Sequence, residues 1–187
     1  KNAISLISGE REMEDYYMIL FRKLFGKVSY YPDKRCENVG SVVASSKEVR
    51  DFLDDLGWSI DESGQKQVPH TILKSPKSVV CAFLRGLFET DGTVHESTIA
   101  FSTVFYPLAK QVQLLLLNLG IVSNLETLSN KVEFRVRLKG LESKHIFNRD
   151  IGFISQRKSD RLKKIFEGRN IDSIRYPLVW VRPLFEE

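Results

Sequence analysis

Apolar residues recur three and four positions apart over residues 76–91, which is the spacing of an amphipathic helix. The positions on the apolar face are Val79, Val80, Phe83, Leu84, Leu87 and Phe88. Ser75 is a favourable N-cap and Pro76 is tolerated in a first helical turn, so the helix is predicted to begin there. Asp91 and Gly92 follow the last apolar residue, and Gly92 is predicted to end the helix in the left-handed conformation.

Similar spacing predicts helices over residues 11–25, after Pro107 and after Ser155. Ser45 and Glu48 are spaced as a capping box, which predicts another helix start at that point. Strict alternation of apolar and polar residues predicts a strand over residues 131–139. Its two faces are Val132, Phe134, Val136 and Leu138 on one side and Lys131, Glu133, Arg135, Arg137 and Lys139 on the other. This strand therefore has one apolar face and one basic face.

The order of the predicted elements repeats along the chain. Residues 4–8 resemble residues 99–103, and residues 49–58 resemble residues 144–153, with a helical pattern and a strand pattern between them in each copy. Only the second copy is preceded by the helix over residues 76–91. If the two copies are equivalent, the partner of that helix is missing from this sequence, and we expect it to be supplied in cis or in trans.

Composition sets broad limits on what the chain does. Its 187 residues carry a net charge of +4, which is compatible with a polyanionic partner but is not diagnostic of one. No apolar run reaches the roughly 20 residues that cross a bilayer, and no signal-peptide pattern is present. Cys36 and Cys81 are too few for a disulfide framework or a zinc cluster. We expect an intracellular protein, cytoplasmic or nucleoid-associated.

One side of the helix over residues 76–91 carries only small residues, because Ala82, Gly86 and Thr90 are four positions apart. A glycine inside a helix costs about 1 kcal/mol relative to alanine, so Gly86 calls for a reason, and close packing of a second helix supplies one. Asp91 lies at the C-terminus of the helix, where the dipole disfavours a negative charge. The sequence there predicts either a bound cation or a solvated acid in a surface turn.

Residues 84–92, LRGLFETDG, resemble the nine-residue motif of the LAGLIDADG homing endonucleases, particularly those embedded in inteins. The sequence departs from the motif at Phe88, where the family has an aliphatic residue. The resemblance implies an α+β fold of two pseudo-symmetric αββαββα units that form a curved antiparallel-sheet saddle. The implied division is a first unit over residues 1–75 without its motif helix, a complete second unit over 76–170, and a tail over 171–187 that returns toward a splicing domain.

The resemblance also implies the activity, which is site-specific cleavage of double-stranded DNA with a long recognition site and a divalent metal ion. Asp91, Lys66 and Lys158 are the implied catalytic residues, and Asp91 with the Thr90 carbonyl is the implied ligand set for Mg²⁺ or Mn²⁺. Ala82, Gly86 and Thr90 are implied to form the interface between the motif helices. The implied DNA-binding residues are Lys131, Arg135, Arg137 and Lys139, and further polar strand positions are Ser29, Tyr31, Ser97, Ser123 and Thr127.

Three alternatives remain open at this point: a DNA-binding regulator that does not cut, a degenerate intein domain, and a maturase that binds structured RNA. Retention of Asp91 together with Lys66 and Lys158 favours the nuclease, whereas loss of the partner acid would favour the regulator. The chain has neither an N-terminal splicing nucleophile nor a terminal His-Asn pair, so we expect no splicing activity from these residues alone.

Overall fold

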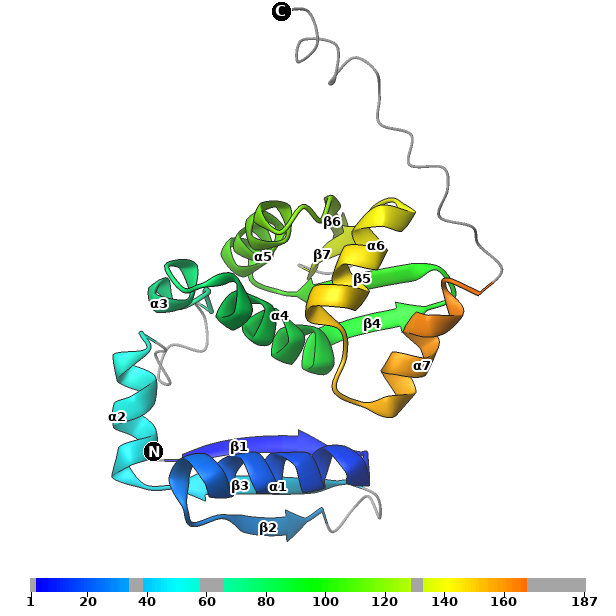
Figure 1. The fold of residues 1–187 in the computed structure, drawn as a ribbon. Helices are drawn as coiled ribbons and strands as arrows, with labels where there is room; N and C mark the ends of the chain where they lie inside the picture. The colour runs from blue at the N-terminus through cyan, green and yellow to red at the C-terminus, as the bar shows by residue number, and fades with distance from the viewer. Residues whose placement is uncertain (1–2, 34–38, 58–65, 129–132, 168–187) are drawn as a thin grey trace, which may run out of the picture.

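The computed structural model describes residues 3–33, 39–57, 66–128 and 133–167. Two antiparallel sheets are each covered by helices on one face, and helices α2, α3 and α4 lie between them along the chain (Figure 1). The elements up to the linker are β1 (Ala3–Ser8), α1 (Arg11–Phe25), β2 (Ser29–Pro32), β3 (Gly40–Ser45) and α2 (Lys47–Asp55). This arrangement confirms the predicted α+β class.

The second part of the chain contains the helix on which the sequence analysis centred, here α4. Its elements are α3 (His70–Leu73), α4 (Lys77–Asp91), β4 (Gly92–His95), β5 (Thr98–Thr103), α5 (Tyr106–Asn118), β6 (Ser123–Leu128), β7 (Glu133–Leu138), α6 (Leu141–Ile146), the π-helical turn η1 (Phe147–Ile151) and α7 (Gln156–Lys164). None of the helices in the described ranges is long and apolar enough for a bilayer crossing.

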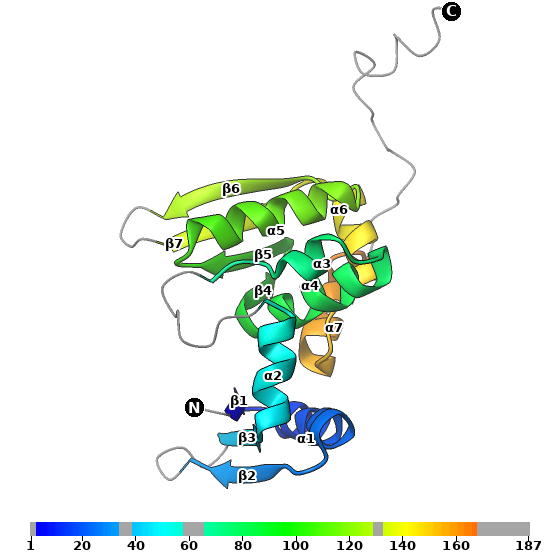
Figure 2. The same cartoon turned by 90° about the vertical axis from the view of Figure 1, so that its left-hand side faces the viewer.

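The internal repeat has a direct counterpart in strand connectivity. Sheet A has the order β1-β3-β2, and sheet B has the order β4-β5-β7-β6. When β4 is left out, both units have the order strand, helix, strand, strand, helix along the chain. In each sheet the last of the three strands, β3 or β7, lies between the other two (Figure 2). The two copies seen in the sequence therefore fold with the same topology.

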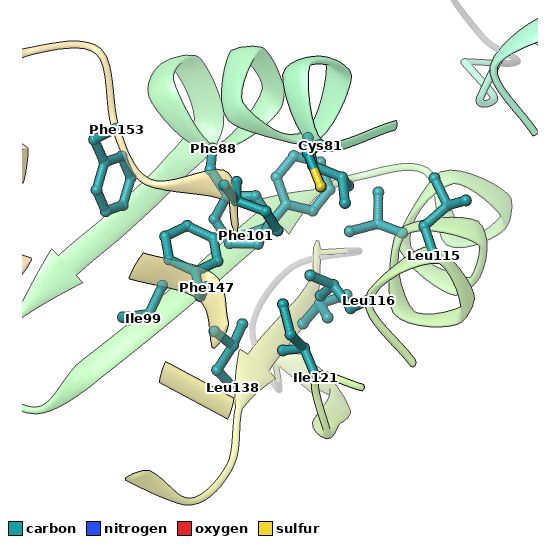
Figure 3. Close-up of a cluster of buried hydrophobic side chains, with 14 of the residues drawn as sticks. Cys81, Phe88, Ile99, Phe101, Leu115, Leu116, Ile121, Leu138, Phe147 and Phe153 are labelled. Atoms are coloured by element: carbon teal, nitrogen blue, oxygen red, sulfur yellow. The ribbon is translucent and has the colours of Figure 1, made fainter. Parts of the chain in front are cut away.

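Each sheet has its own hydrophobic core. Under sheet A, α1 contributes Met13, Tyr17 and Phe21, which pack against Val42 and Ala44 of β3. The larger core lies between sheet B and helices α4 to α7 (Figure 3). Val68 packs in this larger core, so the chain joins the second unit before α4 begins.

The ring of Phe88 is fully buried at the centre of the larger core. Its centroid lies 4.9 Å from that of Phe147 and 5.8 Å from that of Phe101, which links α4 to η1 and to β5. The motif residue that departs from the family pattern is therefore accommodated by an aromatic cluster (Figure 3).

Two predicted helix caps are wrong by about one residue. Ser75 does not cap α4, because Pro76 occupies the N-cap position and the Ser75 hydroxyl donates to the Thr71 carbonyl. The cap of α2 is Ser46, whose hydroxyl accepts a hydrogen bond from the Val49 amide at 3.3 Å, and not Ser45. Ser45 is instead the last residue of β3, where it continues the alternation of buried and less buried residues along the strand.

Candidate active site

The motif helix passes directly into β4 without a left-handed residue. Gly92 has φ −90° and ψ 152°, so the prediction of a left-handed helix end is wrong. The glycine is needed for space, since a Cβ atom at this position would lie 2.3 Å from the Phe88 carbonyl oxygen and 2.7 Å from the Phe88 Cα. The close approach of β4 to the last turn of α4 fixes the backbone on both sides of Asp91, whose side chain is exposed.

Glu89 lies on the other side of the same helical turn and is only 8% exposed. Its carboxylate accepts hydrogen bonds from the Ile154 amide at 2.6 Å, the Ser155 amide at 3.2 Å and the Ser155 hydroxyl at 2.7 Å. These donors lie at the start of α7. Glu89 therefore binds the N-terminus of α7 and is turned away from the surface that Asp91 reaches.

Lys158, from the first turn of α7, is 7% exposed. Its ammonium donates to the carbonyl oxygens of Phe88 at 3.1 Å and Gly92 at 2.8 Å, and also to that of Glu89. Burial lowers the pKa of Lys158 below the ordinary lysine value, and the negative charges of Glu89, Glu10 and Asp91 oppose this shift. The predicted catalytic role of Lys158 stays a prediction, and in this structure the ammonium is held by backbone oxygens.

Asp91 and the Thr90 carbonyl supply hard oxygen donors, which are the ligands that Mg²⁺ and Mn²⁺ prefer. The Thr90 carbonyl is not among the three that Lys158 binds, and the Thr90 hydroxyl donates back to Gly86 and Leu87 within the helix. In the described residues, no group of three or more acidic, histidine or cysteine side chains is arranged so that it could hold a metal ion. The residues present therefore fit half of a divalent-metal site, whose remaining ligands would be water, substrate or a second acid.

Lys66 is exposed, and its ammonium lies 5.7 Å from the centroid of the Phe105 ring. Gly92, the first residue of β4, pairs with Phe101 near the end of the antiparallel strand β5. Phe105 follows β5 and therefore lies at the same end of sheet B as Gly92. Lys66 and Asp91 therefore lie at the same end of sheet B. The catalytic role of Lys66 stays a prediction that this placement permits.

The predicted helix interface is uncovered. Ala82, Gly86 and Thr90 are all exposed, and no atom of the described residues would lie within 4 Å of a Cβ at Gly86, apart from the helix's own backbone. No described residue therefore explains the glycine in the middle of α4. The prediction of a second helix packed against this side stays a prediction.

The basic strand lies in the middle of sheet B, with Arg135 and Arg137 on the face opposite the core. Arg135 Nε donates to the Ser102 hydroxyl at 3.3 Å, and Arg137 forms an ion pair with Glu126 at 3.0 Å. Lys139 is exposed just beyond the strand, and Lys131 lies outside the described residues. The basic face is thus less strongly positive than the sequence pattern indicated, since a carboxylate of the neighbouring strand pairs with Arg137.

The strand registers decide which polar residues share a face with these arginines. Asn124 and Glu126 lie opposite Arg137 and Arg135, so Ser123 and Thr127 lie on the other face of the sheet, away from the arginines. Their predicted role as strand readers stays a prediction that this placement does not favour. Ser97 lies in the turn between β4 and β5. In sheet A, Ser29 and Tyr31 do lie on the open face, which carries no charged strand residue: Ala3, Ser5, Ile7, Ser29, Tyr31, Ser41, Val43 and Ser45.

The burial of Lys158 and the contacts of Glu89 could not be predicted from the sequence, although Lys158 was named there as an implied catalytic residue. The hydrogen-bond partners of each lie 65 to 70 residues away along the chain and are mostly backbone groups, which leave no side-chain pattern.

Residues 78–152 match the family model described as a LAGLIDADG-like domain. The chain carries a LAGLIDADG-like domain. The matched segment begins at the second residue of α4 and includes Asp91 and the whole of sheet B, which confirms the resemblance to the LAGLIDADG family.

Solved structures with the same fold include the homing endonuclease I-DmoI and DUF199/WhiA. The LAGLIDADG fold of the chain is similar to I-DmoI in complex with DNA and Mn, with a TM-score of 0.65, 13% identity and coverage of 80% of each chain. Full-length DUF199/WhiA from Thermatoga maritima matches with a TM-score of 0.58 and 13% identity, over 98% of this chain and 59% of that one.

Curated relatives of the LAGLIDADG-containing chain are much longer proteins. It is 26% identical over 173 residues to the replication factor C small subunit of Methanocaldococcus jannaschii, which covers 90% of this chain and 9% of the relative. It is 32% identical over 151 residues to a DNA polymerase of Thermococcus sp., which covers 73% of this chain and 8% of the relative. The chain spans less than a tenth of either relative.

Proposed function

We propose that this LAGLIDADG chain belongs to a site-specific, divalent-metal-dependent endonuclease that cuts double-stranded DNA. The observation that carries the proposal is the exposed carboxylate of Asp91 at the end of α4, on a backbone fixed from both sides. The helix dipole disfavours a negative charge at a helix C-terminus, and a divalent cation bound by Asp91 would offset this. The solved structures of I-DmoI with its target DNA in the presence of Mg or Mn support the assignment of the cation.

In this proposal Asp91 and the Thr90 carbonyl hold the metal ion, and Lys66 stabilises negative charge that develops on the phosphate. A bound divalent ion would supply Lewis-acid stabilisation and lower the pKa of a water molecule. A second motif helix, in cis or in trans, would pack against Ala82, Gly86 and Thr90 and bring a second acid to the site. Each acid would then serve one strand of the duplex.

DNA would be bound on the open faces of the sheets. Arg135, Arg137 and Lys139 provide cations for phosphates or base edges, and an arginine fork matches the O6 and N7 acceptors of guanine. The ion pair of Arg137 with Glu126 and the hydrogen bond of Arg135 to Ser102 hold these side chains over the sheet.

An intein origin is supported by the variety of the relatives. Matches of similar length occur in proteins named as a replication factor, a DNA helicase, a DNA polymerase and an aminotransferase. The matched part is between 8% and 16% of each of these proteins. A segment shared by proteins with such different names is best explained as an insert that carries its own activity.

A nicking assay on supercoiled plasmid carrying a candidate site, with Mg²⁺, tests the proposal. Asp91→Asn should abolish cleavage and retain binding to the site. The matched control is Asp55→Asn, which changes an exposed acid at the last residue of α2 and should leave cleavage unchanged. Equal cleavage by Asp91→Asn and the parent protein would remove Asp91 from the mechanism.

A second candidate function is sequence-specific DNA binding without cleavage. The observation that favours it is the lack of further acids around Asp91, which lies in no cluster of metal-binding side chains within the described ranges. DNA binding without nicking, in a protein that also contains a second motif helix, would support this regulator-like function over the nuclease.

A further inference from the structure

The C-terminal end of α4 and the N-terminal end of α7 each bind a charged side chain of the other helix. Glu89, from the last turn of α4, accepts hydrogen bonds from the backbone at the start of α7. Lys158, from the first turn of α7, donates to backbone carbonyls at the end of α4. Helix ends leave such amides and carbonyls without partners inside the helix, so each helix supplies what the other lacks.

The charges also match the helix dipoles. A carboxylate lies at the positive N-terminus of α7, and an ammonium lies at the negative C-terminus of α4. Glu89 and Lys158 are 8% and 7% exposed, so these hydrogen bonds are largely shielded from water. We call Glu89, Ser155 and Lys158 the helix-end clamp.

The helix-end clamp surrounds the backbone that carries Asp91. Lys158 binds the carbonyls of Phe88 and Glu89 before Asp91 and that of Gly92 after it. Loss of Lys158 would leave three buried carbonyls without this partner, and the last turn of α4 would then open toward water or fray. Either change would move the Asp91 carboxylate and the Thr90 carbonyl relative to each other.

We propose that the helix-end clamp sets the position of the metal ligands and that Lys158 is a positioning residue. This inference rests on the proposed function, because it assigns Asp91 and Thr90 to a metal ion. An ammonium has three protons, and in this structure three carbonyl oxygens accept them. Direct contact of Lys158 with a phosphate would require breaking these hydrogen bonds, whereas a positioning role requires keeping them.

The two roles predict opposite changes in metal affinity. If Lys158 acted on the site only as a nearby positive charge, Lys158→Met would remove a repulsion and strengthen the binding of a divalent cation. If Lys158 positions the ligands, the same substitution weakens that binding, because the chelating geometry is lost. Lys158→Met keeps most of the side-chain length and apolar volume, which limits the effect on the core.

The experiment compares Lys158→Met, Glu89→Gln and the double variant with the parent chain. Lys164→Met is the control, because Lys164 is an exposed lysine on the same helix. The first readout is amide hydrogen exchange at residues 88–94 and 154–155, compared with exchange in β5 and β7. The second is the Mn²⁺ concentration that half-broadens the NMR signal of the Thr93 amide.

The proposal predicts that exchange at the two helix ends rises about tenfold in each single variant, with little change in β5 and β7. The half-broadening Mn²⁺ concentration should rise severalfold in Lys158→Met, and the double variant should differ little from the single ones. In the cleavage assay the variants should lose turnover while the DNA dissociation constant stays within about twofold of the parent value. Lys164→Met should change none of these quantities.

Unchanged exchange at the end of α4, or tighter Mn²⁺ binding in Lys158→Met, overturns the positioning role. The positioning role is also overturned if the fold-loss of turnover in the double variant equals the product of the two single fold-losses. Such a product means that the free-energy effects add and that the two residues act independently. A parent chain that shows no Mn²⁺ broadening near Asp91 overturns the metal site and the positioning role with it. Broadening without any cleavage overturns only the nuclease activity, and the direction of the Mn²⁺ shift still decides the helix-end clamp.

Discussion

Gly92 and Gly86 lie in the same motif but are predicted to respond to alanine in opposite directions. At Gly92, the added Cβ atom meets the Phe88 carbonyl oxygen at 2.3 Å, the Phe88 Cα at 2.7 Å and the Phe88 carbonyl carbon at 2.9 Å. All three obstacles are backbone atoms, and Phe88 itself is fully buried. The junction of α4 and β4 must therefore open to accept the methyl group.

The magnitude follows from this geometry. Overpacking a well-packed site costs about 1–3 kcal/mol, and Gly92→Ala belongs at the upper end because no flexible side chain can move aside. Opening the junction also displaces the Gly92 carbonyl from Lys158. We expect a loss of about 3 kcal/mol in the free energy of unfolding, which corresponds to a decrease of about 6–12 °C in Tm for a chain of this size.

At Gly86 the calculation has the opposite sign. A Cβ there would meet no atom within 4 Å outside the helix's own backbone, and alanine is a better helix former by about 1 kcal/mol. Gly86→Ala should therefore raise the stability of this chain by up to that amount. The two variants, made in the same motif and differing by one methyl group each, should be about 4 kcal/mol apart in total.

The assay is equilibrium urea unfolding of the parent chain and both variants, followed by circular dichroism and fluorescence. Coincident transitions by the two probes would show that one free energy describes the unfolding. A Gly92→Ala variant within about 0.5 kcal/mol of the parent would refute the steric reasoning. A destabilised Gly86→Ala variant would show that something in the chain already packs against the small-residue side of α4.

Three further outcomes are expected. Arg149 and then Lys77 hold the pKa of Asp150 well below 3.8, so this stabilisation is present above that pH and lost as pH falls below it. Asp150→Asn should therefore lower stability by roughly 1 kcal/mol at pH 7 and flatten the acid limb of a denaturation profile. Ser46→Ala should cost about 1 kcal/mol in urea unfolding, because it removes the N-cap of α2. Arg135→Ala should weaken DNA binding by roughly 10- to 100-fold in fluorescence anisotropy, and Lys164→Met should not.

Periodicity was sufficient to predict the long helices α1, α4 and α5 and the alternation of β7, but not the short helix α3. The inward positions of β7 follow from its alternation, and the fully buried Phe88 follows from the spacing of α4. These properties depend on residues close in sequence, and burial of an apolar stripe is the main force that selects them. The repeat added the topology, because the two copies of one element order form sheets whose strand order is the same apart from the extra strand β4.

The details that the sequence did not predict depend on distant backbone. Gly92 is required because β4 turns back against Phe88, and nothing in the local pattern distinguishes this need for space from a left-handed turn. The burial of Lys158 depends on carbonyl oxygens of α4, about 70 residues earlier. The face on which Ser123 lies could not be predicted because the alternation of β6 is weak, and only its register with β7 decides which residues face the core.

The two sheets have similar backbones but different open faces. Apart from the extra strand β4, sheets A and B share a strand order, yet the open face of β7 carries Arg135 and Arg137 while the open face of sheet A carries hydroxyl and apolar groups. A duplex lying across both would meet guanidinium groups on one half and groups such as Tyr31 and Ile7 on the other. Arginine forks suit guanine edges, and apolar contacts suit the thymine methyl group. The topology is therefore symmetric, whereas the chemistry that would recognise a DNA site is not.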